Sequence, residues 1–109
     1  MKQNAYIAGV GMTQFGKHLD RSLKSLASEA ITIALDDAAL DRKDLSAAYV
    51  GNVGAGMISG QSCVLGQVIL REMGIGGIPV INVENACASS ATAFQQAFTM
   101  VTSWPIKNA

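Results

Sequence analysis

Three short apolar runs in the chain have the length and composition of β-strands. Residues 5–10, 47–50 and 80–83 are almost entirely apolar, and each run is followed by glycine or by polar residues. A continuous apolar run, unlike an alternating one, is typical of a strand that is buried on both faces in a parallel sheet. The pattern therefore predicts three strands, and residues 5–10 are expected to form a fully buried one.

Helical periodicity separates these runs. Apolar residues recur every three or four positions from about residue 22 to residue 40, with charged and hydroxyl residues on the opposite side. Asp20 or Ser22 is the expected N-cap, because either side chain can accept a hydrogen bond from the first helical turn. The same periodicity predicts a helix at residues 64–73, ended by glycines, and a last helix at residues 88–101.

Strands that alternate with helices predict an α/β fold, with a mostly parallel sheet and helices on its faces. The length of 109 residues fits a single domain. Half of the residues are hydrophobic and only 15% are charged, which is a rich apolar content for such a short chain. This composition indicates surface that further protein covers.

Charge and cysteine content narrow the function classes. The formal net charge is zero and the basic residues do not cluster, so nucleic-acid binding has no electrostatic support. No stretch approaches the roughly 18 apolar residues of a membrane span. With one histidine, His18, and two cysteines that form no CxxC pair, we expect no metal site. Free cysteines without a good signal peptide indicate a reducing compartment, and we expect a cytoplasmic protein.

A glycine-rich stretch after the first predicted strand permits a nucleotide-binding interpretation. Residues 11–17 fit the pattern GxxxxGK, but His18 stands where a hydroxyl residue would hold Mg²⁺. Gly9 and Gly11 lack the third glycine of a dinucleotide turn. The simpler interpretation is that these glycines permit tight turns and close packing. A nucleotide-binding module remains an alternative, tested by whether ATP raises the melting temperature.

Cys87 is the residue with the clearest chemical potential. It follows the apolar run that ends at residue 83 and precedes a series of very small residues at 88–91. A cysteine on the turn between a buried strand and a helix is typical of a nucleophile, because the N–H groups of a helix N-terminus favour the thiolate and can stabilise an oxyanion. An inert core thiol is the other interpretation, since free cysteine is among the most buried residue types.

Several segments around Cys87 resemble the thiolase superfamily, and within it the sterol-carrier-protein-type thiolases and their bacterial and archaeal relatives. The resembling segments occur in the family's order and spacing and span nearly all of residues 4 to 100; they are residues 6–18, 54–56 with 60–62, and 77–90. The joint match is much more specific than any one motif. The resemblance identifies this chain with the N-terminal portion of the family's fold.

The resemblance implies a chemistry and a substrate. In the family, the cysteine equivalent to Cys87 is acylated by a coenzyme A thioester, which is a substrate and not a permanently bound cofactor. The reaction is a Claisen-type acyl transfer or its thiolytic reverse. The resemblance assigns no catalytic role to Cys63 or His18: we expect Cys63 to be a buried thiol beside an apolar helix face, and His18 to make a local hydrogen bond. It also places residues 60–71 and 80–83 at the family's dimer contact, so a homo-oligomer is expected.

The departures from the family are equally informative. The activating histidine and the second acid/base cysteine of thiolases lie in segments that have no counterpart here, and the resemblance ends at about Val101. We therefore expect residues 1–101 to form a partial thiolase N-terminal domain and residues 102–109 to be a divergent tail. Two hypotheses remain: an acyltransferase fragment that a separate thiolase half completes and that is inactive alone, or a non-catalytic fragment that acts only through protein association or is a pseudogene product.

Overall fold

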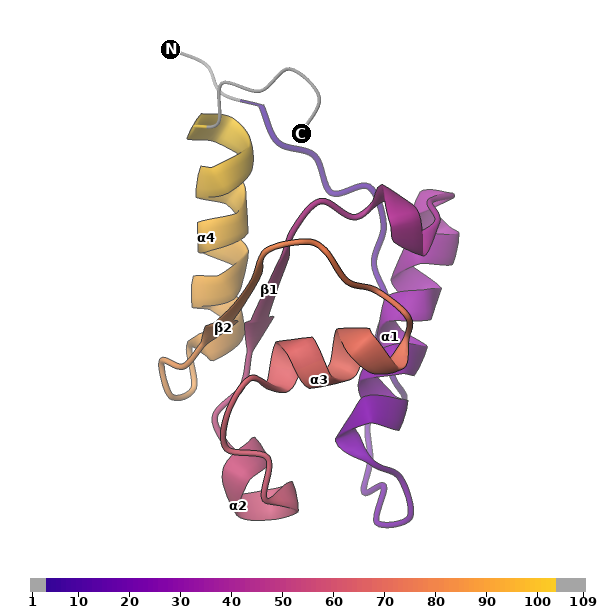
Figure 1. Ribbon diagram of the computed structural model, residues 1–109, viewed down its shortest axis with the longest axis vertical. Helices are drawn as coiled ribbons and strands as arrows, with labels where there is room; N and C mark the ends of the chain where they lie inside the picture. The colour runs from indigo at the N-terminus through magenta and orange to yellow at the C-terminus, as the bar shows by residue number, and fades with distance from the viewer. Residues whose placement is uncertain (1–3, 104–109) are drawn as a thin grey trace.

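The protein is organised around a small parallel sheet that carries helices on both faces (Figure 1). The computed structural model describes residues 4–103. Strand β1 (Ala48–Gly51) pairs in parallel with β2 (Val80–Val83), with Ala48 opposite Val80 and Gly51 opposite Val83. Both strands lie within one residue of their predicted positions. The α/β class with a parallel sheet is confirmed.

Two helices cover opposite faces of the sheet. Helix α4 (Ser89–Ser103) contacts both strands on one face, and α3 (Leu65–Glu72) contacts both on the other. In α3, Gly66 lies against the side chains of Val50 and Val80, and its N–H donates a hydrogen bond of 2.7 Å to the Asn82 carbonyl oxygen Oδ1. A side chain of β2 therefore caps the start of α3 and fixes it against the sheet.

Helix α1 (Leu23–Ala38) packs on the outer side of α3. The Ser22 hydroxyl accepts a hydrogen bond of 3.1 Å from the Ser25 N–H, which confirms Ser22 as the N-cap. The helix ends at Ala39, whose φ of 56° takes the chain into the left-handed region. One core cluster joins α1, α3 and the short helix α2 (Ala55–Ser59). It consists of Ala55, Leu65 and Ile69, against which Leu23, Ala27 and Ile31 pack.

Two short elements were not expected from periodicity. A 3-10 helix, η1 (Arg42–Asp44), precedes β1, and helix α2 (Ala55–Ser59) follows it. The Asn52 side-chain oxygen accepts a hydrogen bond of 3.0 Å from the Ala55 N–H and so starts α2. A helix of five residues is too short to show an apolar period, and its sequence signal is Asn52, two positions before the N-cap Gly54.

The predicted strand at residues 5–10 is wrong: these residues are extended but pair with no strand in the described chain. They lie along α1, where a Cβ at Gly9 would come within 2.4 Å of the Ala34 carbonyl oxygen. The Val10 N–H donates to the Asp37 carboxylate at 2.9 Å. Tyr6 is 86% exposed, because residues 4–103 cover this segment from one side only and a strand buried on both faces needs cover from two.

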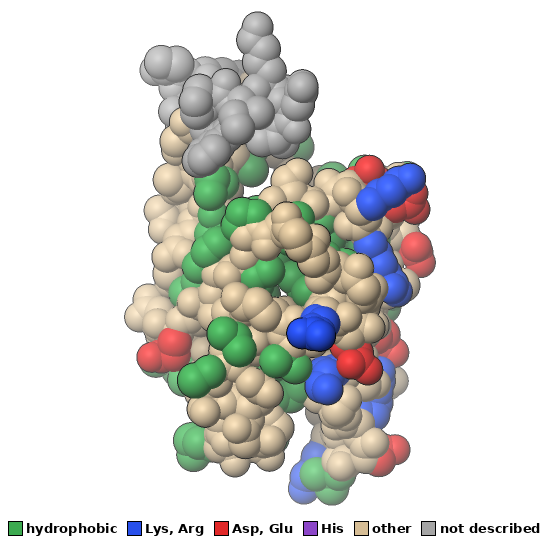
Figure 2. Space-filling model, viewed as in Figure 1, with side chains coloured by type: hydrophobic (Ala, Val, Ile, Leu, Met, Phe, Trp, Pro, Cys, Tyr) green, Lys and Arg blue, Asp and Glu red, His purple; other side chains and the backbone are tan. Residues whose placement is uncertain are grey.

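The core is thin and much apolar surface is exposed. None of the large side chains among residues 4–103 is completely shielded from solvent. Charged side chains gather over α1, while apolar side chains reach the surface around α2 and between α4 and the rest of the molecule (Figure 2). The described residues thus bury only part of the apolar content of the chain.

Candidate functional site

Cys87 lies on the turn between β2 and α4, where the sequence predicts it. Residues 84–88 connect the last residue of β2, Val83, to the first residue of α4, Ser89. The Cys87 side chain is exposed and forms no disulfide. Among residues 4–103 the Cys87 thiol is therefore not buried in a core, and its sulfur is accessible.

The turn has an unusual backbone conformation directly before the cysteine. Ala86 has a φ of 47°, in the left-handed region that residues other than glycine seldom adopt. Its N–H donates a hydrogen bond of 2.6 Å to Oε2 of Glu84. A left-handed residue between a strand and a helix turns the chain sharply, and Cys87 therefore stands out from the end of the sheet.

Ser89 ties the two sides of this turn together. Its hydroxyl accepts a hydrogen bond of 2.8 Å from the Asn85 N–H and donates one of 2.7 Å to the Ala86 carbonyl. Ser89 is 5% exposed and is the one buried polar side chain in the part of the chain that the structure describes. Sequence reasoning missed this role; the available signal was a hydroxyl residue at a helix start two positions after the cysteine.

A glycine in β1 allows α4 to approach the sheet at this point. A Cβ on Gly51 would lie 2.7 Å from both the carbonyl carbon and the carbonyl oxygen of Ser89, and 2.8 Å from the Ser90 nitrogen. No real side chain fits at such distances, so the first turn of α4 rests directly on the backbone of β1. The end of β1 thereby sets the position of the helix that follows Cys87.

The first N–H groups after Cys87 are already used in the turn. The Ala88 N–H donates to the Asn85 carbonyl at 2.9 Å, and the Ser89 N–H donates to the Ala86 carbonyl at 3.2 Å. These two N–H groups therefore stabilise the turn itself. The expectation that N–H groups at the start of the helix stabilise an oxyanion does not hold for these two.

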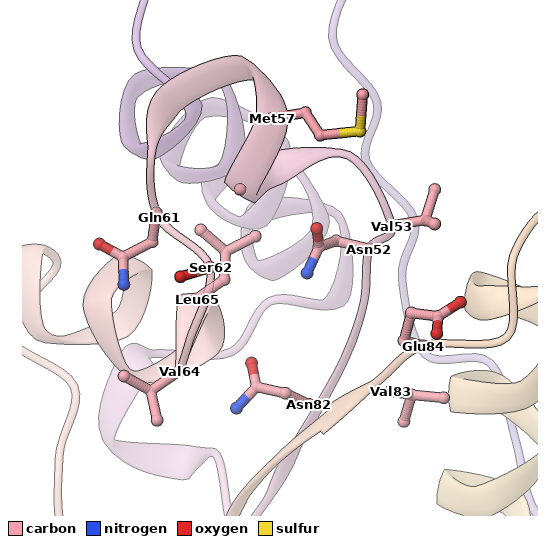
Figure 3. Close-up of a pocket in the computed structure, with 11 residues that line it drawn as sticks. Asn52, Val53, Met57, Gln61, Ser62, Val64, Leu65, Asn82, Val83 and Glu84 are labelled. Atoms are coloured by element: carbon pink, nitrogen blue, oxygen red, sulfur yellow. The ribbon is translucent and has the colours of Figure 1, made fainter.

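A pocket of about 420 Å³ opens beside the turn, at the carboxyl ends of both strands. Asn82 of β2 and Asn52, the residue after β1, face it, and Glu84 lies at its edge (Figure 3). Asn52 caps α2 and Asn82 caps α3, so the oxygens of both amides are committed to the fold. Glu84 connects the pocket to the cysteine turn through its bond to Ala86. Crevices at the carboxyl ends of parallel strands are where α/β proteins place ligands.

The other two candidate residues stand apart from this turn. His18 donates from Nε2 to the Gln14 carbonyl at 2.8 Å, which is the local hydrogen bond that we expected. Cys63 is exposed in the loop before α3, so the prediction of a buried thiol is wrong. The apolar face of the helix starts only at Leu65, and the chain reaches it through Val64 in a left-handed conformation with a φ of 48°. Neither side chain is hydrogen-bonded to Cys87.

Two further observations concern residues 4–103. Over this range, no three His, Cys, Asp or Glu side chains gather closely enough to hold a metal ion. No helix in the same part of the chain is long and apolar enough to cross a membrane.

Comparison with known proteins agrees with the motif around Cys87. Residues 5–106 match the family described as the thiolase N-terminal domain. The chain is 41% identical over 97 residues to an acetyl-CoA acetyltransferase of Methanocaldococcus jannaschii, covering 89% of this chain and 24% of that protein. It is 37% identical over 99 residues to the benzoylsuccinyl-CoA thiolase subunit BbsB of Thauera aromatica, covering 89% and 24%.

A third relative extends the similarity to animals. Sterol carrier protein 2 of Gallus gallus is 38% identical over 95 residues, which are 85% of this chain and 16% of that protein. The chain thus spans about a quarter or less of the length of these relatives. The proposed boundary at residue 101 lies within α4, which continues to Ser103, and residues 104–109 lie outside the described range.

Proposed function

Because this chain belongs to the thiolase family and matches its N-terminal domain, we propose that it supplies the nucleophile of a thiolase-like acyl transfer between coenzyme A thioesters. The observation that carries the proposal is the placement of Cys87, exposed on a sharp turn between β2 and α4 with a left-handed residue before it. A nucleophile needs this kind of access and a fixed backbone.

The proposed step forms a covalent thioester. The Cys87 thiolate attacks the carbonyl carbon of an acyl-CoA, the bond between that carbon and the coenzyme A sulfur breaks, and coenzyme A leaves as a thiolate that takes up a proton. The acyl group then passes from Cys87 to a second substrate. Coenzyme A thioesters act here as substrates that come and go, and the proposal includes no permanently bound cofactor.

Among residues 4–103, no hydrogen bond joins Cys87 to a side chain that could act as a base. A thiolase-like cycle needs a base that generates the thiolate and a group that moves a proton at the second substrate. His18 is bonded to the Gln14 carbonyl, and Cys63 belongs to the loop before α3. We propose that a complementing thiolase half supplies both functions and that residues 1–109 alone do not turn over substrate.

Exposed apolar surface favours association with further protein. On α4, Phe94 is 61% exposed and Phe98 is 44% exposed, and in the segment before α1 the Phe15 side chain is 96% exposed. The edges of the two-stranded sheet are also unpaired in the described chain. The second candidate function is therefore a non-catalytic one, in which the chain acts only by pairing with itself or with a thiolase partner. The two free cysteines fit a reducing compartment, and we propose the cytoplasm as the location.

Acylation of the full chain by acetyl-CoA, followed by intact mass and peptide mapping, tests the proposal. We expect one acetyl group per chain, located on Cys87. The chain offers a matched pair of variants, because Cys63 and Cys87 are both exposed and unpaired. Cys63→Ser should still be acylated and Cys87→Ser should not. Acylation that is absent, or that is equal at both cysteines, contradicts the proposed nucleophile and leaves the association hypothesis.

A further inference from the structure

We propose that Ser89 is a positioning residue for Cys87, holding the cysteine turn in its reactive shape through its buried hydroxyl. This inference rests on the proposed function, since it concerns the presentation of the same nucleophile. Among the described residues, no hydrogen bond joins Ser89 to the Cys87 sulfur. It bonds to backbone groups of the two residues that precede Cys87, the Asn85 N–H and the Ala86 carbonyl.

The hydroxyl is fully used on the turn. It accepts from the Asn85 N–H at 2.8 Å and donates to the Ala86 carbonyl at 2.7 Å, so it bridges two consecutive residues whose backbone conformations differ sharply. Because Ser89 is 5% exposed, water cannot easily replace either bond. Loss of the oxygen would leave the Asn85 N–H without this partner and release the segment before the cysteine.

The anchor itself is rigid. The backbone of Ser89 rests on Gly51 of β1, at distances that leave no room for a side chain on Gly51. The hydroxyl therefore transmits the position of the sheet to the turn, and from there to the sulfur of Cys87. A rigid support of this kind is what a nucleophile requires to hold a productive geometry.

The conformation of Ala86 explains why the turn needs support. A left-handed φ of 47° is unfavourable for alanine and persists only where the surroundings impose it. Glu84 contributes one bond, to the Ala86 N–H, but its side chain belongs to an exposed residue and water competes for that N–H. The buried bonds of Ser89 are therefore the stronger constraint on this conformation.

Three variants of the full chain test the proposal. Ser89→Ala removes the hydroxyl, Ser89→Thr retains one, and Ser90→Ala is the matched control, because Ser90 is adjacent, exposed and makes no side-chain hydrogen bond in the described chain. Two rates are measured on each variant: acylation of Cys87 by acetyl-CoA, and alkylation of Cys87 relative to Cys63 by iodoacetamide. The Cys63 rate is an internal reference that a general loss of structure would also change.

For Ser89→Ala we expect acylation to slow by roughly 10- to 100-fold, the effect of a displacement of about 1 Å at a reacting group. The ratio of Cys87 to Cys63 alkylation should fall towards one. Ser89→Thr should recover most of both effects, and Ser90→Ala should resemble the unmodified chain. An unchanged alkylation ratio in Ser89→Ala overturns the proposal. The proposal is also overturned if Ser89→Thr loses as much acylation and alkylation rate as Ser89→Ala while circular dichroism shows that it is folded.

If the Ser89 variants do not fold, amide hydrogen exchange of the unmodified chain tests the inference instead. The Asn85 N–H should exchange much more slowly than the N–H groups of the exposed loop before α3, because its acceptor is a buried hydroxyl. Fast exchange at Asn85 overturns the inference. A different result contradicts the proposed function: the unmodified chain is not acylated at Cys87. In that case the alkylation ratio still tests the positioning role of Ser89.

Discussion

Gly51 and Ser89 are in backbone contact although they lie on different elements, β1 and α4. A Cβ at Gly51 would be 2.7 Å from the Ser89 carbonyl carbon. The end of β1 therefore fixes the first turn of α4, and with it the segment that carries Cys87. The geometry of Cys87 therefore depends on Gly51, a residue without a side chain that could react or bind.

Gly51→Ala should disturb this contact. The added methyl group must push α4 away from β1. It would meet backbone atoms of Ser89 and Ser90, which cannot move aside by changing rotamer as a side chain can. We expect a loss of about 1–3 kcal/mol in the free energy of unfolding, as for overpacked cores. Urea unfolding followed by circular dichroism measures it. Gly76→Ala is the control, since a Cβ there meets nothing within 4 Å, and equal midpoints for the two variants would contradict the prediction.

The two cysteines should differ in reactivity although both are exposed. Cys87 precedes the N-terminus of the 15-residue helix α4, and the N-terminus of a helix in general attracts negative charge. Cys63 precedes the N-terminus of the shorter helix α3, of 8 residues, and lies two positions before its first residue, the same spacing as Cys87 has from α4. We expect faster alkylation of Cys87 at neutral pH, read by competitive iodoacetamide labelling and peptide mass.

The same labelling in a high urea concentration provides the reference for this comparison. In the unfolded chain the rates of the two thiols should approach each other. Equal or reversed rates in the folded chain would show that the β2–α4 turn does not activate Cys87.

The chain should associate in solution. Its unpaired sheet edges and exposed aromatic side chains on α4, Phe94 and Phe98, favour contact with other protein. We expect light scattering to give a mass above the 11.3 kDa of one chain, or to show poorly soluble material. Phe94→Lys combined with Phe98→Lys should reduce association if α4 is the surface involved. A stable monomer at tens of micromolar would argue against this expectation.

The chain alone should not catalyse thiolysis of acetoacetyl-CoA. General acid–base groups each contribute about 10²–10⁴ in rate, and catalytic groups that act as a unit fail together when one is missing. Purified chain is assayed beside Cys87→Ser, with and without an added thiolase half. Turnover that depends on Cys87 and needs no added partner would mean that His18 or Cys63 has a catalytic role, contrary to the proposal.

Periodicity predicted most of the fold. The three longest helices and the strands β1 and β2 appear close to their expected ranges, and Ser22 caps α1 as expected. The prediction of a buried strand at residues 5–10 was wrong. An apolar composition shows that a segment avoids water, but it does not show which surface covers the segment. For the same reason Cys63, which lies two positions before the apolar face of α3, was expected to be buried and is exposed.

The sequence by itself determined where Cys87 stands: an apolar run, a cysteine and a series of small residues specify a strand, a turn and a helix through local conformational preferences. Only the tertiary structure decided what supports that turn. Gly51 and Ser89 are far apart in the chain, and their contact exists because β1 and α4 pack face to face. Glu84 and Ser89 act through hydrogen bonds whose geometry depends on the left-handed conformation of Ala86. Local preferences are encoded residue by residue, whereas such contacts form only once the elements have packed.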